Sequence, residues 1–480
     1  FVSGGYGDRV GIGPSGGLQE SKGYDLHYGS YVLRGWRAVI ADLKDERIIK
    51  ARDRILDLYS YVWSPGPGMP WSSRTSIPKV AGGTYNAWQA KYGWKGWGGP
   101  DLVTGVNDHN EWFAARRRNY YAVTYHGRLT PTWEGEGFHG QIGLGGGGFC
   151  QLHVPSVGQV ITAKPNSSYG AGMHLSEWPN FHVHSLVGTT ADGLPLVTAN
   201  SEHWNAKLEG NVVSSSANVR QSSVSVSRRY TYKSSSIACE VRLGPTHHDN
   251  VFSIWGGRPK LRGKVLEAYE MIPFADAAKP KGKPRSTKNR TRIDVLAEDG
   301  TVAGTLDDQA ATTAHGFGLR TGDATSFTGA GVMIACNEDF GALIEFDKPR
   351  KVYRGLNDTI VVELARGLTV ATDVAFSYRI VPYTGKQPEL GATGSDSLAV
   401  LVLPTIQAVG SLDDLPKRLN EVDPLKVQAD QQTVGTLRLG VSGEHLALVA
   451  DIRDGKVQHN ATPWKGSCLE VFGNMPDKTT

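Results

Sequence analysis

The spacing of apolar and polar residues divides the chain into three parts. Over residues 31–63 apolar positions recur at helical spacing, with one interruption near 44–46, which predicts two amphipathic helices. Prolines end the second helix, at positions 65, 67 and 70. Two helices cannot bury their apolar faces alone, so we expect residues 1–115 to be the end of a larger helical domain that begins before Phe1.

From about residue 119 the pattern changes to short runs in which apolar and polar residues alternate. SVSVSRRYTY at 223–232 and KVLEAYEMIP at 264–273 are examples, and Gly, Pro and Asn bound such runs. This spacing is typical of an antiparallel β-sandwich, which we place at residues 116–385. A linker-like stretch then leads into a last strand-rich block, so 386–480 is predicted to hold a linker and a small, partial β-sandwich. The predicted fold class is mainly β.

Composition and charge exclude several classes of function. The formal net charge is +4, and the basic residues do not form a stripe of the kind that binds nucleic acid, which argues against a nucleic-acid partner. The most basic stretch, 279–292, contains two prolines and is interpreted as a solvated loop, with an anion-binding patch as the alternative. No apolar run reaches the roughly 18 residues that span a bilayer. Four widely separated cysteines without a CxxC pair exclude a zinc ribbon and argue against a disulfide framework.

Candidate chemistry is concentrated before the first predicted helix, in PSGGLQESKGYDLHYGSY at 14–31. Other short motifs follow it in order: Ser73-Arg74, ARRRNYY at 115–121, WEGEG at 133–137, HSLVGTT at 184–190 and YEMIP at 269–273. The ordered series resembles the helical-toroid polysaccharide lyases, which include heparinase II/III-like, chondroitin, hyaluronate and xanthan lyases. The chain departs from their pattern at SGGL (15–18), which lacks the usual Asp, at Gly137 in place of Asn, and at Val187 in place of Pro.

This resemblance implies the end of an α/α toroid followed by an antiparallel β-supersandwich, with an active cleft between them. It also implies a polysaccharide lyase that cleaves a uronic-acid-containing glycan by β-elimination. That reaction needs a base at C5, a proton donor for the leaving oxygen and groups that neutralise the carboxylate. The residues that would carry these roles are Tyr24 as base and acid, Tyr28 as its alternative, His27, Arg74, Glu136 and His184.

Substrate contacts are predicted for residues of the same first part of the chain, namely Gln19, Glu20, Trp94 and Trp97. The last block resembles the family 9 carbohydrate-binding modules, through LALVAD at 446–451 and PWKGSCLEVF at 463–472. In that motif Trp464 either stacks on a sugar or is structural. The elimination needs no cofactor, and a structural calcium or another divalent metal stays open. His182 and His184 alternate on one strand, where they are an edge-strand pair, metal ligands, or a neutralising His at the cleft as the resemblance to heparinase-like enzymes implies.

Two other functions stay open. One is a non-catalytic carbohydrate-binding protein that keeps the sandwich without the elimination machinery. The other is a glycoside hydrolase, which needs two carboxylates and has candidates in Glu20, Glu134 and Glu136. The aromatic residues between Tyr24 and Tyr31 can equally be core residues. The expected partners are an acidic polysaccharide and another chain or segment that supplies the missing toroid. The substrate class implies a secreted or periplasmic protein.

Overall fold

The computed structural model divides the chain into two compact units, Phe1–Asp396 and Ser397–Thr480, and each is described by itself. The residues that it describes are 11–12, 18–20, 23–24, 36, 39–62, 100–106, 111–127, 147–154, 158–163, 184–198, 201, 205–219, 222–246, 261–275, 291–306, 312–313, 319–320, 325–336, 340–355, 358–391, 419, 425–429, 432–442 and 445–452. The domain limits expected from the sequence remain predictions.

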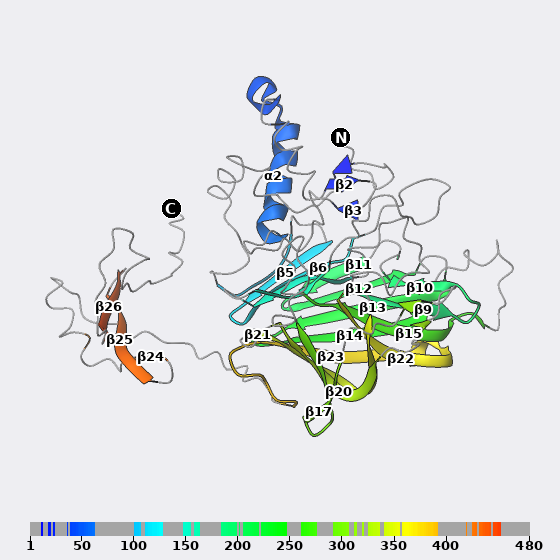
Figure 1. Ribbon diagram of the computed structural model, residues 1–480. Coiled ribbons are helices and arrows are strands. Elements are labelled where there is room, and N and C mark those ends of the chain that lie inside the picture. The colour runs from blue at the N-terminus through cyan, green and yellow to red at the C-terminus, as the bar shows by residue number, and fades with distance from the viewer. Residues whose placement is uncertain are drawn as a thin grey trace, which may run out of the picture. The chain divides into compact units, whose positions relative to one another are not determined.

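The helical part contains α2 (Glu46–Val62), preceded by a helical stretch at 39–43 (Figure 1). The break lies where the apolar pattern predicts it. Lys44 adopts a φ of 50°, which ends the first stretch. The Asp45 carboxylate then accepts the backbone N–H of Arg47 at 2.8 Å, as an N-cap residue does. That these helices end an α/α toroid remains a prediction.

The described residues of the first predicted chemical segment lie on short strands. Its described residues make a three-stranded antiparallel sheet of β1 (Gly11–Ile12), β2 (Leu18–Glu20) and β3 (Gly23–Tyr24). Gln19 pairs with Tyr24 across β2 and β3. Glycines at 16, 17 and 23 disfavour a helix here and suit tight turns. The sequence places this segment before the first helix, and the described helical positions begin at residue 36.

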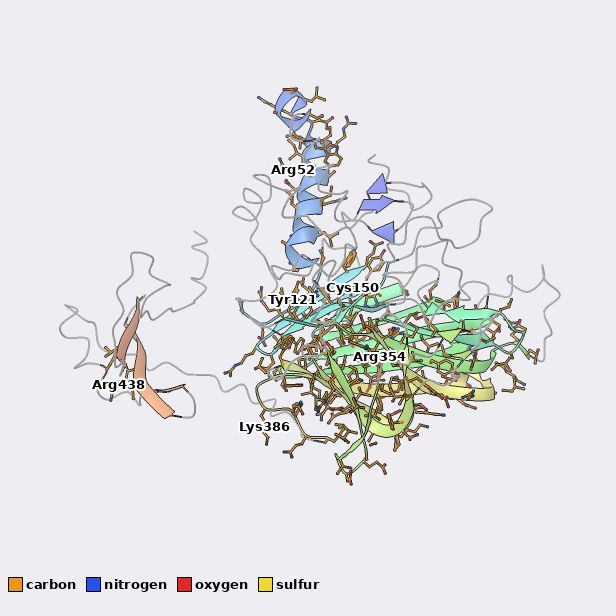
Figure 2. All side chains as sticks on the ribbon, viewed as in Figure 1. Arg52, Tyr121, Cys150, Arg354, Lys386 and Arg438 are labelled. Carbon is orange, nitrogen blue, oxygen red and sulfur yellow. The ribbon has the colours of Figure 1, made fainter. Side chains whose placement is uncertain are left out.

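A five-stranded antiparallel sheet forms one layer of the first unit. Its strands, in spatial order, are β4 (Leu102–Gly105), β5 (Trp112–Arg117), β6 (Tyr120–Tyr125), β7 (Gly148–Val154) and β8 (Gly158–Thr162). Its strands are largely buried on both faces. The Tyr121 hydroxyl donates to the carbonyl oxygen of Tyr61 at 2.5 Å, which joins the sheet to the end of α2 (Figure 2).

A large antiparallel sheet forms the other layer. Along its main path the order is β10-β9-β15-β22-β21-β23-β14-β13-β12-β11, and β20, β16 and β17 extend from β21. The strands are β9 (Ser185–Thr190), β10 (Pro195–Val197), β11 (Asn205–Glu209), β12 (Val212–Asn218), β13 (Val224–Tyr232), β14 (Ile237–Pro245), β15 (Lys264–Pro273), β16 (Arg292–Leu296), β17 (Val302–Thr305), β20 (Ser326–Ala335), β21 (Phe340–Gly355), β22 (Thr359–Val370) and β23 (Ala375–Thr384).

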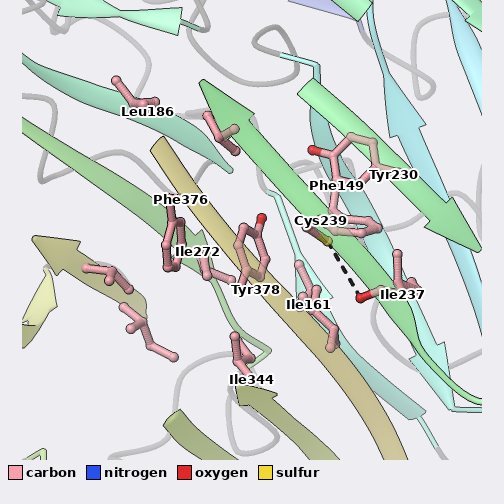
Figure 3. Close-up of a cluster of buried hydrophobic side chains, with 14 of the residues drawn as sticks. Phe149, Ile161, Leu186, Tyr230, Ile237, Cys239, Ile272, Ile344, Phe376 and Tyr378 are labelled. Atoms are coloured by element: carbon pink, nitrogen blue, oxygen red, sulfur yellow. Dashed lines mark hydrogen bonds between the residues drawn. The ribbon is translucent and has the colours of Figure 1, made fainter. Parts of the chain in front are cut away.

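The hydrophobic core lies between these two sheets. Buried apolar residues of both belong to one cluster, in which the ring centroid of Phe149 in the small sheet lies 5.0 Å from that of Tyr230 in the large one (Figure 3). Polar contacts also cross the interface, since the Tyr120 hydroxyl donates to the carbonyl oxygen of Lys233 at 2.6 Å. The prediction of a mainly β protein with large antiparallel sheets is confirmed. Strand alternation sends every second side chain into this core.

The second unit contributes a three-stranded antiparallel sheet. It consists of β24 (Leu425–Ala429), β25 (Gln432–Ser442) and β26 (His445–Ile452), in that order. LALVAD, the run that resembles a carbohydrate-binding module, lies in β26 and pairs with β25. Trp464 lies outside the described residues.

Candidate functional site

The structure describes few of the site residues that the sequence predicts. Gln19, Glu20 and Tyr24 lie on short strands whose backbone alone is described. Seven predicted site residues lie outside the described residues: His27, Tyr28, Arg74, Trp94, Trp97, Glu136 and Trp464. Glu134 and His182 lie outside them as well. His184 is the predicted site residue whose side chain the structure describes, and its roles at a cleft or a metal stay predictions.

His184 precedes β9 and is buried between the two sheets. Its Nδ1 accepts the backbone N–H of Phe149 at 2.8 Å. The ring proton therefore lies on Nε2, which is 2.8 Å from Glu270 Oε1 and 2.9 Å from the Tyr378 hydroxyl. An imidazolium has no acceptor to offer Phe149, and burial lowers the pKa of His184. The ring is consequently held neutral in one tautomer.

Glu270 and Arg228 form a buried two-point ion pair beside this ring. Arg228 Nη1 donates to Glu270 Oε1 at 2.6 Å, and Nη2 donates to Oε2 at 3.0 Å. Burial by itself raises the pKa of Glu270, but the facing guanidinium and the His184 N–H outweigh it and lower the pKa to about 2. Both side chains are fully buried, so each charge depends on its partner for compensation.

These four side chains are not poised for proton transfer near neutral pH. Glu270 is ionised, and its low pKa makes it a weak base. Burial raises the pKa of the Tyr378 phenol well above its ordinary value, so it stays protonated. General acid–base catalysis works best with a group whose pKa lies near the working pH. The geometry of the cluster therefore fits a structural role that joins β9, β13, β15 and β23.

A second feature lies on β11 to β14, on the face opposite the core, where the exposed side chains of these strands point. Figure 1 shows the four strands side by side. Two cross-strand rows of side chains meet there. The first row is Lys207, Ser214, Arg229 and Glu240, each paired with the next in the strand register. The second row is Asn205, Ser216, Ser227 and Arg242, paired in the same way.

These rows enclose an open hollow of about 380 Å³, which we call the serine hollow. Its floor carries the short side chains of Ser214, Ser216 and Ser227, and longer side chains surround them. The rim consists of Asn205, Lys207, Arg229, Glu240 and Arg242. Ser215 and Arg228 complete the lining, and both side chains are buried because alternation turns them to the core. The hollow exists because short hydroxyl residues lie side by side between long ones.

The serine hollow is rich in hydrogen-bonding groups and positive charge. Three cations face one carboxylate at its rim. That carboxylate, Glu240, lies 3.6 Å from Arg242 through its Oε2 and the Nη2 atom. Serine hydroxyls donate and accept, while the cations only donate. Such a surface can bind a polyhydroxyl ligand that carries negative charge.

Sequence reasoning missed the serine hollow. The signal was present in VVSSSAN and VSVSRRYTY, which alternate polar and apolar residues. Alternation shows that Ser214 and Ser216 lie on the solvent face of their strand. It shows the same for Ser227 and Arg229 on theirs. It does not show which residues of separate strands lie opposite each other, because that depends on the register.

A second hollow, of about 450 Å³, has the opposite charge. It is lined by residues of β16, β17, β20 and the segment after β23, and its carboxylates are those of Asp294, Glu298, Asp299 and Glu389. Arg292 offsets Asp294 directly, since the two form an ion pair of 2.6 Å. Within the described ranges, no group of three or more His, Cys, Asp or Glu side chains is arranged to hold a metal ion. None of the described helices is long and apolar enough to cross a bilayer.

Comparison with known proteins gives structural similarity alone. No protein-family model and no curated protein sequence matches the chain. Among solved structures, a galactose mutarotase-like protein from Clostridium acetobutylicum is 8% identical at a TM-score of 0.34, over 60% of this chain and 99% of that one. A putative aldose 1-epimerase from Escherichia coli K12 is 8% identical at 0.31, over 59% and 100%. The 4-alpha-glucanotransferase from Thermococcus litoralis is 8% identical at 0.28, over 75% of this chain.

This chain spans about half of the glucanotransferase, or 47% of its length. Because these TM-scores are low, the similarity assigns neither a family nor an activity. The solved structures are nevertheless named as a mutarotase-like protein, a putative epimerase and a transferase, and none of these three is named as a polysaccharide lyase. This finding contradicts the prediction that the chain is a polysaccharide lyase, so that prediction is wrong. β-Elimination is therefore not proposed for this chain.

Proposed function

We propose that this chain is a carbohydrate-binding protein that binds an acidic glycan at the serine hollow without cleaving it. The observation that supports the proposal is the combination of a hydroxyl-lined floor with three cations at the rim. A glycan presents hydroxyl groups to the floor and carboxylate or sulfate groups to the cations. Hydrogen bonds to charged groups are about twice as strong as neutral ones, so the charged contacts supply most of the affinity.

The lining of the hollow favours an acidic ligand over a neutral sugar or a nucleic acid. It contains no aromatic side chain among its described residues. Aromatic stacking is a main source of affinity for single-stranded nucleic acids, which makes them poor ligands here. A neutral sugar would gain hydrogen bonds alone, and these contribute little net free energy in water.

The same lining supports binding over hydrolysis. A glycosidase of the usual kind places two carboxyl groups on either side of the scissile bond. The described lining of the serine hollow offers one, Glu240, and that group has Arg242 beside it. The buried cluster around Glu270 is also committed to internal partners.

Arg229→Ala tests the proposal. We expect the intact protein to bind polygalacturonate, and the variant to bind it about tenfold more weakly because one charge-assisted contact is lost. Isothermal titration calorimetry at low salt measures the affinity. Lys386→Ala is the matched control, since it removes an exposed cation on another part of the same unit and should leave the affinity unchanged.

Two further measurements separate binding from catalysis. Long incubation with polygalacturonate should release neither new reducing ends nor the ultraviolet absorbance of an unsaturated uronate. Dextran, a neutral glycan, should not bind measurably. Equal affinity of wild type and Arg229→Ala, or cleavage of the polymer, would contradict the proposal.

A further inference from the structure

We infer that Glu240 makes the serine hollow selective for glycans with isolated carboxylates and disfavours densely sulfated ones. The inference rests on the glycan-binding function proposed above and concerns the ligand class of the same site. Glu240 is the single carboxylate of the lining, and the rim around it carries three cations.

The position of Glu240 relative to the cations is the first argument. On β14 it is the direct cross-strand partner of Arg229 on β13. Its Oε2 also lies 3.6 Å from Nη2 of Arg242, two residues along the same strand. Glu240 therefore adjoins two of the three cations. The third, Lys207, is two strands from Arg229, a separation of about 10 Å at the usual strand spacing.

This arrangement divides the hollow into two chemically different halves. Ser214 lies between Lys207 and Arg229, and no carboxylate of the lining lies there, so an anionic group bound between them meets positive charge and a hydroxyl donor. Around Arg242 the Glu240 carboxylate already occupies the neighbourhood of the guanidinium. A second anionic group placed there must overcome like-charge repulsion.

Glu240 can make a different kind of contact with a sugar, because an ionised carboxylate only accepts hydrogen bonds. It can accept a hydrogen bond from a sugar hydroxyl and cannot form an ion pair with a sulfate. Its side chain is 39% exposed, so the acceptor is accessible from solvent. The ligand that satisfies both halves carries one carboxylate toward Lys207 and Arg229, and hydroxyls toward the serines and Glu240. A uronate polymer has this pattern, whereas a polysulfated glycan places further anions beside Glu240.

Glu240→Gln tests the inference, because it removes the charge and keeps the shape. We measure affinity for polygalacturonate and for heparin with wild type and variant, at two salt concentrations. The variant should bind heparin about fivefold more tightly, as expected for the removal of one exposed like charge. Its affinity for polygalacturonate should stay the same or fall. Added salt should reduce the heparin gain.

Glu389→Gln is the control, since it removes an exposed carboxylate away from the serine hollow and changes net charge by the same amount. It should leave the ratio of the two affinities unchanged. If Glu240→Gln changes both affinities by one common factor, or weakens heparin binding, Glu240 does not discriminate between the two polymers and only positions Arg242. If wild type binds neither polymer, the proposed glycan-binding function itself fails. If wild type binds polygalacturonate and Arg229→Ala weakens it, the function stands whatever Glu240→Gln shows.

Discussion

At the scale of single residues, the interior of the sandwich holds an ion pair where apolar side chains would suffice. Arg228 lies on β13 among alternating apolar residues, and Glu270 occupies the equivalent inward position on β15. Each would carry an uncompensated buried charge without the other. Tyr378 and His184 add polar contacts to the same carboxylate.

Glu270→Gln should therefore strongly destabilise the first unit. Removal of one partner of a buried pair typically costs about 3–5 kcal/mol of unfolding free energy, because Arg228 stays buried and charged. Urea denaturation followed by tryptophan fluorescence measures the change. Glu389→Gln, at an exposed carboxylate, should change stability little. A Glu270→Gln variant as stable as wild type would show that Arg228 is not buried in solution.

At the scale of elements, close packing of strands β9 and β15 depends on Gly188. A Cβ atom at this position would overlap the backbone carbonyl of Glu267 on β15. Backbone cannot move aside as the end of a side chain can, so the paired strands would have to separate. The glycine is thus required by the approach of two strands and not by its own dihedral angles.

Gly188→Ala should lower the unfolding free energy by about 1–3 kcal/mol, the usual range for overpacking. Gly105→Ala in β4 is the matched control. There a Cβ atom would make ordinary contacts with Phe113 at 3.8 Å, and the stability should change little. Thermal melting of the two variants gives the comparison, and equal melting temperatures would contradict the proposed clash.

At the scale of the whole molecule, buried histidines link stability to pH. His126 and His153 are fully buried, and the pKa of each is lowered to about 3, chiefly by burial and for His126 also by Arg228. Burial lowers the pKa of His184 as well. In the unfolded chain these rings take up protons near their ordinary pKa of about 6.5. The unfolded state therefore binds more protons than the folded state below that pH.

Stability should consequently fall as the pH drops from about 6.5 toward 3. Glu111 acts in the opposite direction, because burial raises its pKa to about 7, but it is one group against three histidines. Glu270 acts in the same direction as the histidines at lower pH, since its stabilising charge is lost as the pH falls from about 4.5 to about 2. Denaturant midpoints between pH 8 and pH 4 measure the slope. His126→Gln should reduce the slope. Constant stability over this range would show that these rings are accessible to solvent.

The sequence by itself determined the helix break at 44–46, the sheet-rich middle of the chain and its mainly β class. These features follow from local spacing and from residues such as Lys44 and Asp45, whose effects act within a few positions of the chain. The sequence missed the short strands Leu18–Glu20 and Gly23–Tyr24, because so few residues are too short to show an alternating pattern.

Only the tertiary structure decided which distant residues meet. Arg228 and Glu270 are 42 positions apart, and His184 and Tyr378 are 194 apart, so no periodicity links them. The serine hollow likewise depends on the register that sets Lys207, Ser214, Arg229 and Glu240 in one row. A shift of one residue in any strand would turn its polar side chains to the core. Alternation fixes the face of a residue within its strand, while pairing between strands fixes its neighbours.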